Sequence, residues 1–376
     1  MKVLVISPYH AGSHRAWAEG YRKYSQCDLH LLTLPARYWK WRMHGGAVTL
    51  ARKFSALDFK PDLILATDML DLSTFLSLSR RKTAHIPVVL YMHENQLTYP
   101  LPEDPSTGPM RRQGGERDLH YAFINYTSML SATRVVFNSE YHRRSFIEAL
   151  PGFLNHFPEF RETRNIQRLE TNSSVLPVGL DVTELESDHT WQKREKPLIL
   201  WNQRWEYDKN PEEFFQAILA LSEENITFDV ALCGESFQKQ PKVFESATSA
   251  LAERLIHCGY AERHLYRRLL WEATVTVSTA LHEFFGISIL EAALCETLTL
   301  VPNRLSYPEI LPSEFHEHCL YNSYEELLQL LRRALTYPQS NLETASALAT
   351  HIRSYDWKIV APKYDHFLKE TSQCFQ

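Results

Sequence analysis

The sequence predicts an α/β protein of two doubly wound domains, each a parallel sheet with helices on both faces. Short apolar runs, typical of strands that are buried on both faces, alternate with helical patterns along the chain. The alternation breaks once, near residues 176–180, and then restarts. The length of 376 residues suits two domains, because one domain takes about 150 residues.

The first half supplies strands that alternate with helices, the pattern of a parallel sheet. The expected strands are residues 2–7, 29–34, 62–66, 88–92 and 134–138, and the expected helices are 16–24 and a segment near 116–132. We take residues 1–180 as the N-terminal domain.

The second half repeats this organisation after a polar linker at residues 184–196. The expected strands are residues 197–201, 228–232, 274–278 and 297–301, and the expected helices are 211–223, 241–256 and 287–294. We take residues 181–355 as the C-terminal domain. A last helix over about 357–370, within residues 356–376, is able to pack back on the N-terminal domain or on the C-terminal one.

Composition and charge limit the class of protein. Hydrophobic residues make up 44%, which excludes a disordered chain. Six cysteines without a CxxC pair favour a reducing compartment. Without a bilayer-long apolar run or a signal peptide, we expect a cytoplasmic protein with no membrane partner.

The net charge of −5 argues against a nucleic-acid partner, but the charge is uneven. Residues 1–180 hold 22 Lys and Arg against 16 Asp and Glu, a net +6, and the remainder holds 18 against 29, a net −11. Such a division indicates either halves with different partners or chance and solvation.

Polar residues follow several of the expected strands, where doubly wound domains bind ligands. Gly12 allows a phosphate to approach the backbone before a helix, although an ordinary turn has the same residues. His93, Glu94, Asn95 and Gln96 follow strand 88–92. His93 and Glu94 are suited to acid and base chemistry, and the alternative is a hydrogen-bonded loop that braces the turn.

Two further segments in the second half carry charge. Arg204 and Lys209, beside a helix start, are suited to a diphosphate, unless they only pair with neighbouring carboxylates at the surface. Glu283 lies in a loop, Gly286 opens the next turn, and Glu291 lies one turn into an apolar helix. The backbone N–H groups of Phe285, Gly286 and Ile287 then point out of the helix start, as phosphate ligands do.

Residues 37–42 interleave Arg and Lys with Tyr and Trp, a composition that stacks bases and contacts phosphates. The alternative for Trp39 and Trp41 is an aromatic part of the core.

Taken together, these segments resemble a known family. The Glu283…Glu291 pair and the Arg204…Lys209 pair resemble the motifs of retaining, family-4-type glycosyltransferases with the GT-B fold. Seven phrases are similar to one subgroup, the tRNA-queuosine α-mannosyltransferases: Gly12–His14, Leu34–Arg42, His93–Pro100, Val136–Ser139, Trp201–Pro211, His282–Gly286 and Tyr307–Glu309.

The resemblance implies two facing Rossmann-like domains, with transfer of mannose from GDP-mannose to queuosine in a tRNA anticodon in the cleft between them. It implies no cofactor and no metal, because side-chain cations replace the ion. The catalytic residues are then His93, Arg204, Lys209 and Glu283. The donor residues are Gly12, Arg204, Lys209, Glu283, Phe285, Gly286, Ile287 and Glu291, and the acceptor residues are Ser13, His14, Trp39, Trp41, Arg42, Glu94 and Asn95.

Two alternatives keep the same scaffold: a glycosyltransferase with another nucleotide sugar or a non-tRNA acceptor, and a non-catalytic protein that binds RNA or a nucleotide sugar. One position departs from the family pattern. Glu296 stands where relatives have Gly, at a helix C-terminus where Gly relieves strain.

Overall fold

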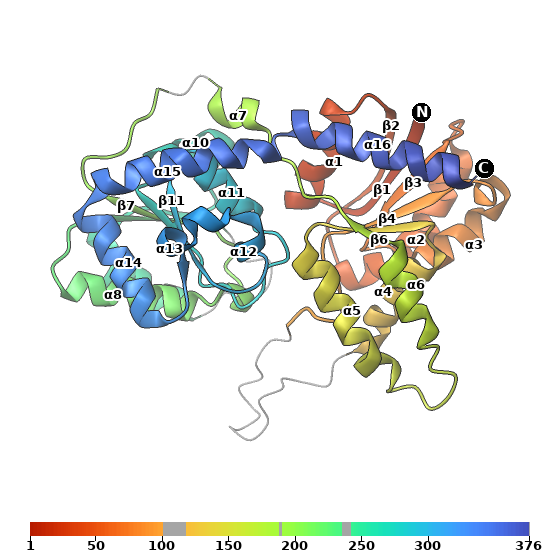
Figure 1. Ribbon diagram of the computed structural model, residues 1–376, viewed down its shortest axis with the longest axis horizontal. Coiled ribbons are helices and arrows are strands. Elements are labelled where there is room, and N and C mark those ends of the chain that lie inside the picture. The colour runs from red at the N-terminus through yellow and green to blue at the C-terminus, as the bar shows by residue number, and fades with distance from the viewer. Residues whose placement is uncertain (101–117, 188–189, 235–241, 376) are drawn as a thin grey trace. The chain divides into compact units, whose positions relative to one another are not determined.

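The computed structural model describes residues 1–100, 118–187, 190–234 and 242–375 (Figure 1). Contacts divide the chain into one unit of Met1–Gly179 with Trp357–Gln376, and another of Leu180–Asp356. Each unit contains a six-stranded, fully parallel sheet. The predicted α/β class is confirmed, whereas the expected cleft between the domains stays a prediction.

The first unit has the strand order β2-β1-β3-β4-β5-β6. Its strands are β1 (Lys2–His10), β2 (Asp28–Pro35), β3 (Leu63–Thr67), β4 (Val88–Met92), β5 (Arg134–Phe137) and β6 (Ser173–Val175). Its helices are α1 (Gly12–Tyr24), α2 (Trp39–Ala56), α3 (Leu72–Thr83), α4 (Leu119–Ser131), α5 (Glu140–Leu154), α6 (Arg164–Asn172) and α16 (Trp357–Phe375). The central strands β3 and β4 are buried along their whole length, as apolar runs between two helical layers must be.

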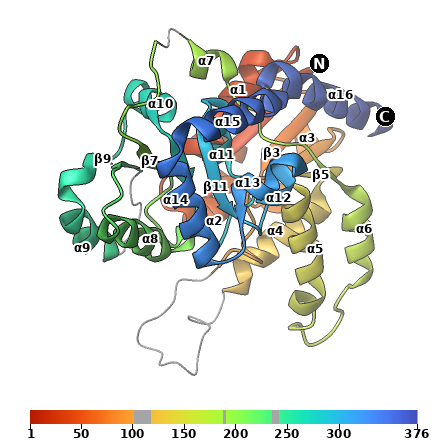
Figure 2. The same ribbon diagram turned by 60° about the vertical axis from the view of Figure 1, so that its left-hand side comes forward.

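The last helix, α16, lies along α1 (Figures 1 and 2). The indole N–H of Trp17 donates to the hydroxyl of Tyr364 at 3.1 Å, and the hydroxyl of Tyr21 donates to Asp365 at 2.7 Å. Both contacts are buried, so the C-terminus of the chain is part of the first unit.

The second unit has the strand order β12-β11-β10-β7-β8-β9. Its strands are β7 (Leu198–Trp201), β8 (Asp229–Cys233), β9 (Leu255–Gly259), β10 (Val275–Val277), β11 (Leu298–Pro302) and β12 (Leu320–Tyr321). Its helices are α7 (Val182–Glu186), α8 (Pro211–Glu223), α9 (Val243–Ala250), α10 (Arg263–Glu272), α11 (Ile287–Leu294), α12 (Tyr307–Ile310), α13 (His316–Cys319), α14 (Tyr324–Thr336) and α15 (Pro338–Ile352).

The expected strands are all present, but several helices differ from the sequence expectation. Helix α1 begins at Gly12 rather than at residue 16. Among the described residues, ten helices and three short strands were not predicted: α2, α3, α5, α6, α7, α10, α12, α13, α14 and α15, and β6, β9 and β12. In α2 and α3, Gly and polar residues interrupt the apolar stripes. The first residues of the expected helices 116–132 and 241–256 lie outside the described residues.

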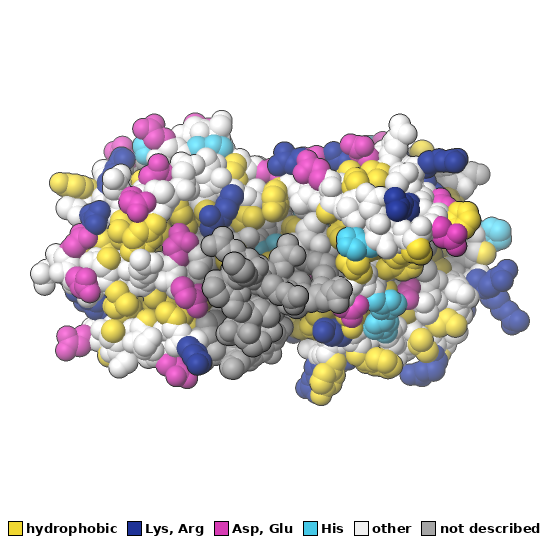
Figure 3. Space-filling model, turned by 90° about the horizontal axis from the view of Figure 1, so that it is seen from below, with side chains coloured by type: hydrophobic (Ala, Val, Ile, Leu, Met, Phe, Trp, Pro, Cys, Tyr) yellow, Lys and Arg dark blue, Asp and Glu magenta, His cyan; other side chains and the backbone are white. Residues whose placement is uncertain are grey.

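Charged side chains are unevenly distributed over the surface. On the face in Figure 3, Asp and Glu gather over the second unit, and Lys and Arg are more evident over the first. This distribution agrees with the opposite net charges of the two halves of the sequence. Within the described residues, none of the helices combines the length and apolar character needed to cross a bilayer.

Glu296 follows the end of α11 in a left-handed conformation, with φ of 55°. Such a backbone costs an L-residue about 1 kcal/mol or more, whereas Gly adopts it freely. The Glu296 side chain has a contact of 3.5 Å with Ser346, too long to offset this strain.

We therefore expect Glu296→Gly to raise the free energy of unfolding by about 0.5–1 kcal/mol, measured by urea denaturation. The matched control is Glu343→Gly in the middle of α15. There the same replacement should lower stability by a similar amount. Equal losses in both variants would contradict the assignment of strain to Glu296.

Candidate active site

The predicted site residues lie where parallel strands end. His14 follows β1 and His93 follows β4 in the first unit. Lys209 follows β7 and Glu283 follows β10 in the second. The carboxyl ends of parallel strands share one edge of a sheet, so each unit gathers its own polar group there.

In the first unit, His93 is held by Asp68, which directly follows β3. The carboxylate oxygen Oδ1 of Asp68 accepts the backbone N–H of His93 at 2.9 Å and lies 3.2 Å from its Nδ1. Both side chains are buried. Burial lowers the pKa of His93 to about 3 and raises the pKa of Asp68. The imidazole is therefore neutral at pH 7, with a proton on Nδ1 directed at the carboxylate.

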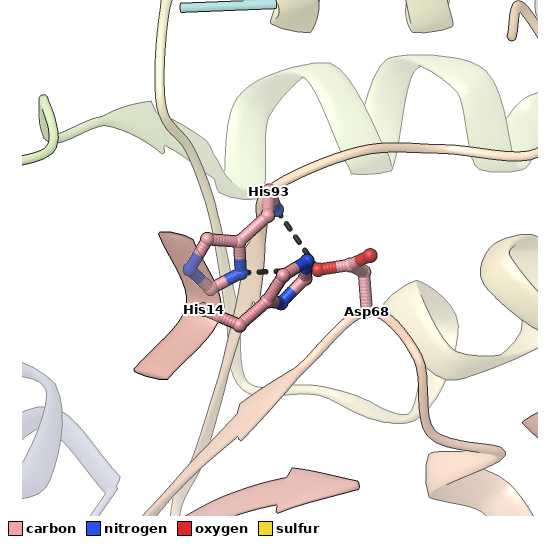
Figure 4. A group of neighbouring side chains, drawn as sticks. All are labelled: His14, Asp68 and His93. Carbon is pink, nitrogen blue, oxygen red and sulfur yellow. Dashed lines mark hydrogen bonds and ion pairs between the residues drawn. The ribbon is translucent and has the colours of Figure 1, made fainter. Parts of the chain in front are cut away.

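The opposite nitrogen of His93, Nε2, is buried and has no hydrogen-bond partner among the described residues. Aromatic rings fix its direction. The rings of Trp17 and Tyr91 each lie 4.8 Å from the imidazole. The ring of His14 lies 4.3 Å away, and Figure 4 shows it beside His93 and Asp68. With the proton on Nδ1, Nε2 acts as a hydrogen-bond acceptor.

His14, Asp68 and His93 also have the residue types of a zinc site, and their ligand atoms lie within 4.8 Å of one another. The two imidazole planes are tilted by only 37°, so the rings partly stack. Because nitrogen lone pairs lie in the ring plane, one ring must turn before both point at a single ion. We therefore assign this group to hydrogen bonding.

The loop after His93 braces itself. The side-chain oxygen of buried Asn95 accepts the backbone N–H groups of Leu97 and Thr98, at 3.0 and 2.8 Å. The Glu94 carboxylate accepts the side-chain amide of Gln96. Asn95 thus has the bracing role that was the alternative at the sequence level.

Gly12 is the first residue of α1 and has φ of 50°. Its preceding residue caps no N–H group, the first turn carries no acidic residue, and Ser13 beside it is exposed. A Cβ on Gly12 would meet no atom within 4 Å, so the turn faces open space. A helix start of this kind favours an anion.

In the second unit, Lys209 lies between two carboxylates. Its ammonium is 3.1 Å from Glu283 and 3.3 Å from Asp208, and it donates to the carbonyl of His282 at 2.8 Å. The Lys209 side chain is only 5% exposed. Lys209 is therefore a buried ion-pair partner rather than the surface cation of the sequence-level alternative.

Arg204 is more open than Lys209, with 46% of its side chain exposed, and lies 3.5 Å from Asp208. Burial by itself raises the pKa of Glu283 and Asp208. The charges of Lys209 and Arg204 and the hydrogen bond from Lys209 together outweigh burial and hold both pKa values below the usual range. Both carboxylates are consequently ionised at neutral pH.

Gly286 caps the start of α11 with φ of 95°. A Cβ there would lie 3.1 Å from both Ile310 and Tyr307. Both the positive φ and this close approach favour Gly over any other residue at this position. Phe285 and Ile287 stand on either side of this cap, with the N–H of Phe285 3.5 Å from the Glu283 carboxylate.

Glu291 lies in α11, as expected, and is held by two residues of α10. The hydroxyl of Tyr266 donates to one carboxylate oxygen at 2.8 Å, and Arg263 approaches the other at 3.3 Å. Arg263 also forms a two-bond contact with Glu184. The carboxylate of Glu291 therefore has a fixed orientation.

Trp39, Trp41 and Arg42 lie in the first turn of α2. Trp41 is exposed, so the core alternative is wrong for this residue. Arg42 donates to the carbonyl of Pro35 at 3.0 Å.

Three supporting residues were missed at the sequence level. Asp68 follows a buried strand, the same signal that singled out His93. Tyr266 and Arg263 lie within helix α10 rather than directly after a strand, so their position in the sequence does not indicate a site.

Comparisons with known proteins cover most of the chain. Residues 2–180 match the family described as tRNA-queuosine alpha-mannosyltransferase N-terminal, and residues 183–351 match glycosyl transferases group 1. The tRNA-queuosine alpha-mannosyltransferase of Drosophila melanogaster is 32% identical over 90% of this chain and 88% of its own. A GDP-mannose-dependent alpha-(1-6)-phosphatidylinositol dimannoside mannosyltransferase of Mycobacterium tuberculosis is 22% identical over 45% of each chain.

Solved structures show the fold. Sucrose-phosphate synthase of Thermosynechococcus elongatus matches with a TM-score of 0.71 and 12% identity, covering both chains fully. HepE of Anabaena, in complex with UDP, matches with a TM-score of 0.68 and 14% identity over 98% of this chain and 100% of its own. The chain therefore has the GT-B fold, and its group 1 domain makes it a glycosyltransferase.

Removing the charge of Lys209 should leave two buried carboxylates without their cation. We expect Lys209→Met to lower the free energy of unfolding by about 3–5 kcal/mol. Arg204→Met, at an exposed position beside the same Asp208, should cost less than about 1 kcal/mol. Urea denaturation measures both, and similar losses would show that Lys209 is not the buried partner.

His282 provides a pH-dependent contribution to stability. Burial, followed by the charge of Lys209, lowers its pKa to about 4. Its contribution is therefore complete above the unfolded pKa of about 6.5 and is lost as the pH falls towards 4.

Between pH 6 and 5, His282→Asn should reduce the pH dependence of unfolding by up to about 1.4 kcal/mol per pH unit. His366→Asn, at an exposed position, should leave the dependence unchanged. Urea titrations at several pH values measure it, and an unaltered slope in His282→Asn would refute the assignment.

Proposed function

The chain belongs to the tRNA-queuosine α-mannosyltransferase family, and we propose that it transfers mannose from GDP-mannose to queuosine in a tRNA anticodon, with retention at the sugar carbon. The observation that carries this proposal is the 32% identity to the Drosophila enzyme over 90% of the chain. GDP-mannose as donor is supported by the name of the mycobacterial relative.

The second unit is the proposed donor side. Arg204, which is half exposed, and Lys209 bind the diphosphate, together with the N–H groups around Gly286. Glu291, oriented by Tyr266, accepts the ribose hydroxyls, and Glu283 accepts hydroxyls of the sugar. Lys209 already neutralises Glu283 and Asp208, so Arg204 supplies the more available charge for the diphosphate.

We infer attack from the same face as the leaving group. The bond from the anomeric carbon to the diphosphate breaks as the acceptor hydroxyl bonds to that carbon, and the acceptor proton passes to a diphosphate oxygen. Positive side chains stabilise the charge that develops on the diphosphate, so the transfer needs no metal and no cofactor. The Nε2 atom of His93 accepts a hydrogen bond from a hydroxyl of the reacting sugar. Gly12 lies near the diphosphate. Ser13, His14 and Glu94 contact the nucleoside that receives the sugar.

A tRNA substrate and six free cysteines support a cytoplasmic location. Other nucleotide sugars and a non-catalytic RNA-binding protein are the alternatives that the experiment must separate.

The direct test incubates the protein with GDP-mannose or UDP-glucose and with tRNA that carries or lacks queuosine. We expect GDP release and a hexosylated queuosine nucleoside by mass spectrometry only with GDP-mannose and queuosine tRNA. Product formed only from UDP-glucose would show that the proposed donor is wrong. The absence of product with either donor would favour a non-catalytic binding protein.

Arg204→Ala should reduce turnover by about 10²–10³, the loss typical of one charge-stabilising donor. It should leave the melting temperature near that of the parent protein, because Arg204 is exposed. Arg332→Ala, which removes an exposed ion pair with Glu224 in the same unit, is the control with normal turnover. Normal turnover in Arg204→Ala would exclude the proposed diphosphate contact.

A further inference from the structure

Helix α2 lies in a long stretch of the chain that lacks negative charge. Between Leu29 and Leu57 the sequence has five Lys and Arg (37, 40, 42, 52 and 53) and no Asp or Glu. The inner side of α2 is buried through Met43, Leu50 and Phe54. The outer side is therefore the only place on this helix where a partner can bind.

The outer side of α2 is aromatic and apolar as well as basic. We define the α2 outer face as Tyr38, Trp41, Gly45, Val48 and Arg52, which recur at helical spacing. Tyr38, Trp41 and Val48 are among the most exposed large apolar side chains of the described residues. Exposed apolar residues at this spacing form one continuous stripe.

The indole of Trp41 is held flat on the helix. A Cβ on Gly45 would lie 2.4 Å from two ring atoms of Trp41, so only Gly lets the ring lie there. Trp41 nevertheless remains 62% exposed to solvent. A large ring with one face packed and one face in solvent is pre-ordered for stacking, because little entropy is lost when a partner binds.

Polar rings continue from α2 to the first turn of α4. The ammonium of Lys40 lies 5.7 Å from the ring of Trp39 and 5.8 Å from that of Tyr121. The ring of His44 lies 5.3 Å from Tyr121 and stacks on His120 at 4.7 Å. This side of α2 thus offers hydrogen-bond donors and a cation beside the stripe.

Tyr38 caps α2 in a left-handed conformation, with φ of 52°. For a residue other than Gly this conformation costs about 1 kcal/mol or more. Its ring is left almost entirely in solvent. Tyr38 therefore presents its ring to solvent at the start of the α2 outer face.

We propose that the α2 outer face, with Arg37 and Lys40, binds a single-stranded loop of the RNA acceptor. Bases stack on Trp41 and Tyr38, and Arg37, Lys40 and Arg52 contact phosphates. A polyanion fits a face without a single carboxylate, and flat bases fit exposed rings. This inference rests on the proposed function, from which it takes the RNA as substrate.

The test measures binding of a fluorescent RNA hairpin that lacks queuosine, by anisotropy at several salt concentrations. Trp41→Ala should weaken binding about tenfold, because stacking on an aromatic residue contributes about 1–3 kcal/mol per base. Gly45→Ala should weaken RNA binding severalfold. The new methyl group pushes the indole of Trp41 out of its position, although the indole itself is still present. Arg52→Ala should lower the slope of log affinity against log salt by about one.

Tyr337→Ala is the matched control, because this aromatic residue of the second unit is 64% exposed, close to the value for Trp41. It should bind RNA normally. The Michaelis constant for queuosine tRNA should rise about tenfold in Trp41→Ala and not in Tyr337→Ala. Thermal melting checks that each variant is folded. If Trp41→Ala does not fold, the RNA binding of Gly45→Ala tests the inference instead.

Unchanged RNA binding in both Trp41→Ala and Gly45→Ala would overturn the inference and leave the proposed function intact. A dimer of the parent protein that Trp41→Ala dissociates in the absence of RNA would also overturn it, in favour of a second copy of the chain. Failure of the parent protein to modify queuosine tRNA would instead overturn the proposed function.

Discussion

The ammonium of Lys209, buried between Asp208 and Glu283, is the interaction on which the site of the second unit depends. It joins the loop after β7 to the loop after β10, and backbone bonds reinforce the junction: the N–H of Leu281 donates to the carbonyl of Asp208 at 2.9 Å. Neither carboxylate is stable there without the cation. Glu283 and the following Gly286 turn are positioned by this pair.

In the first unit, the residue at the end of the strand is an uncharged imidazole, that of His93, instead of a charged group. Burial keeps His93 uncharged, Asp68 determines which of its nitrogens carries the proton, and Trp17 and Tyr91 fix its ring. One unit thus supplies fixed charge and the other a directed hydrogen-bond acceptor.

Most of the strands and the principal candidate site residues could be predicted because their signals are local. A buried parallel strand is a continuous apolar run, and a polar residue directly after it, such as His93 after β4, marks its carboxyl end. Helix α2 was missed because two glycines interrupt its pattern, and those glycines serve packing: Gly45 accommodates the ring of Trp41. Tyr266 and Arg263 were missed because their role exists only through contact with Glu291, 25 and 28 residues further along the chain.

The sequence by itself determined the α/β class, nine of the twelve strands in the described residues, the four polar segments and the resemblance to a glycosyltransferase family, since each of these depends on neighbouring residues. The tertiary structure decided the rest. It placed α16 on α1, gave Lys209 two carboxylates instead of solvent, paired Asp68 with His93 and exposed Trp41. These outcomes depend on which distant segments meet and on how much water they exclude. Burial and partners of this kind set the charge of Lys209 and Glu283 and the direction of His93.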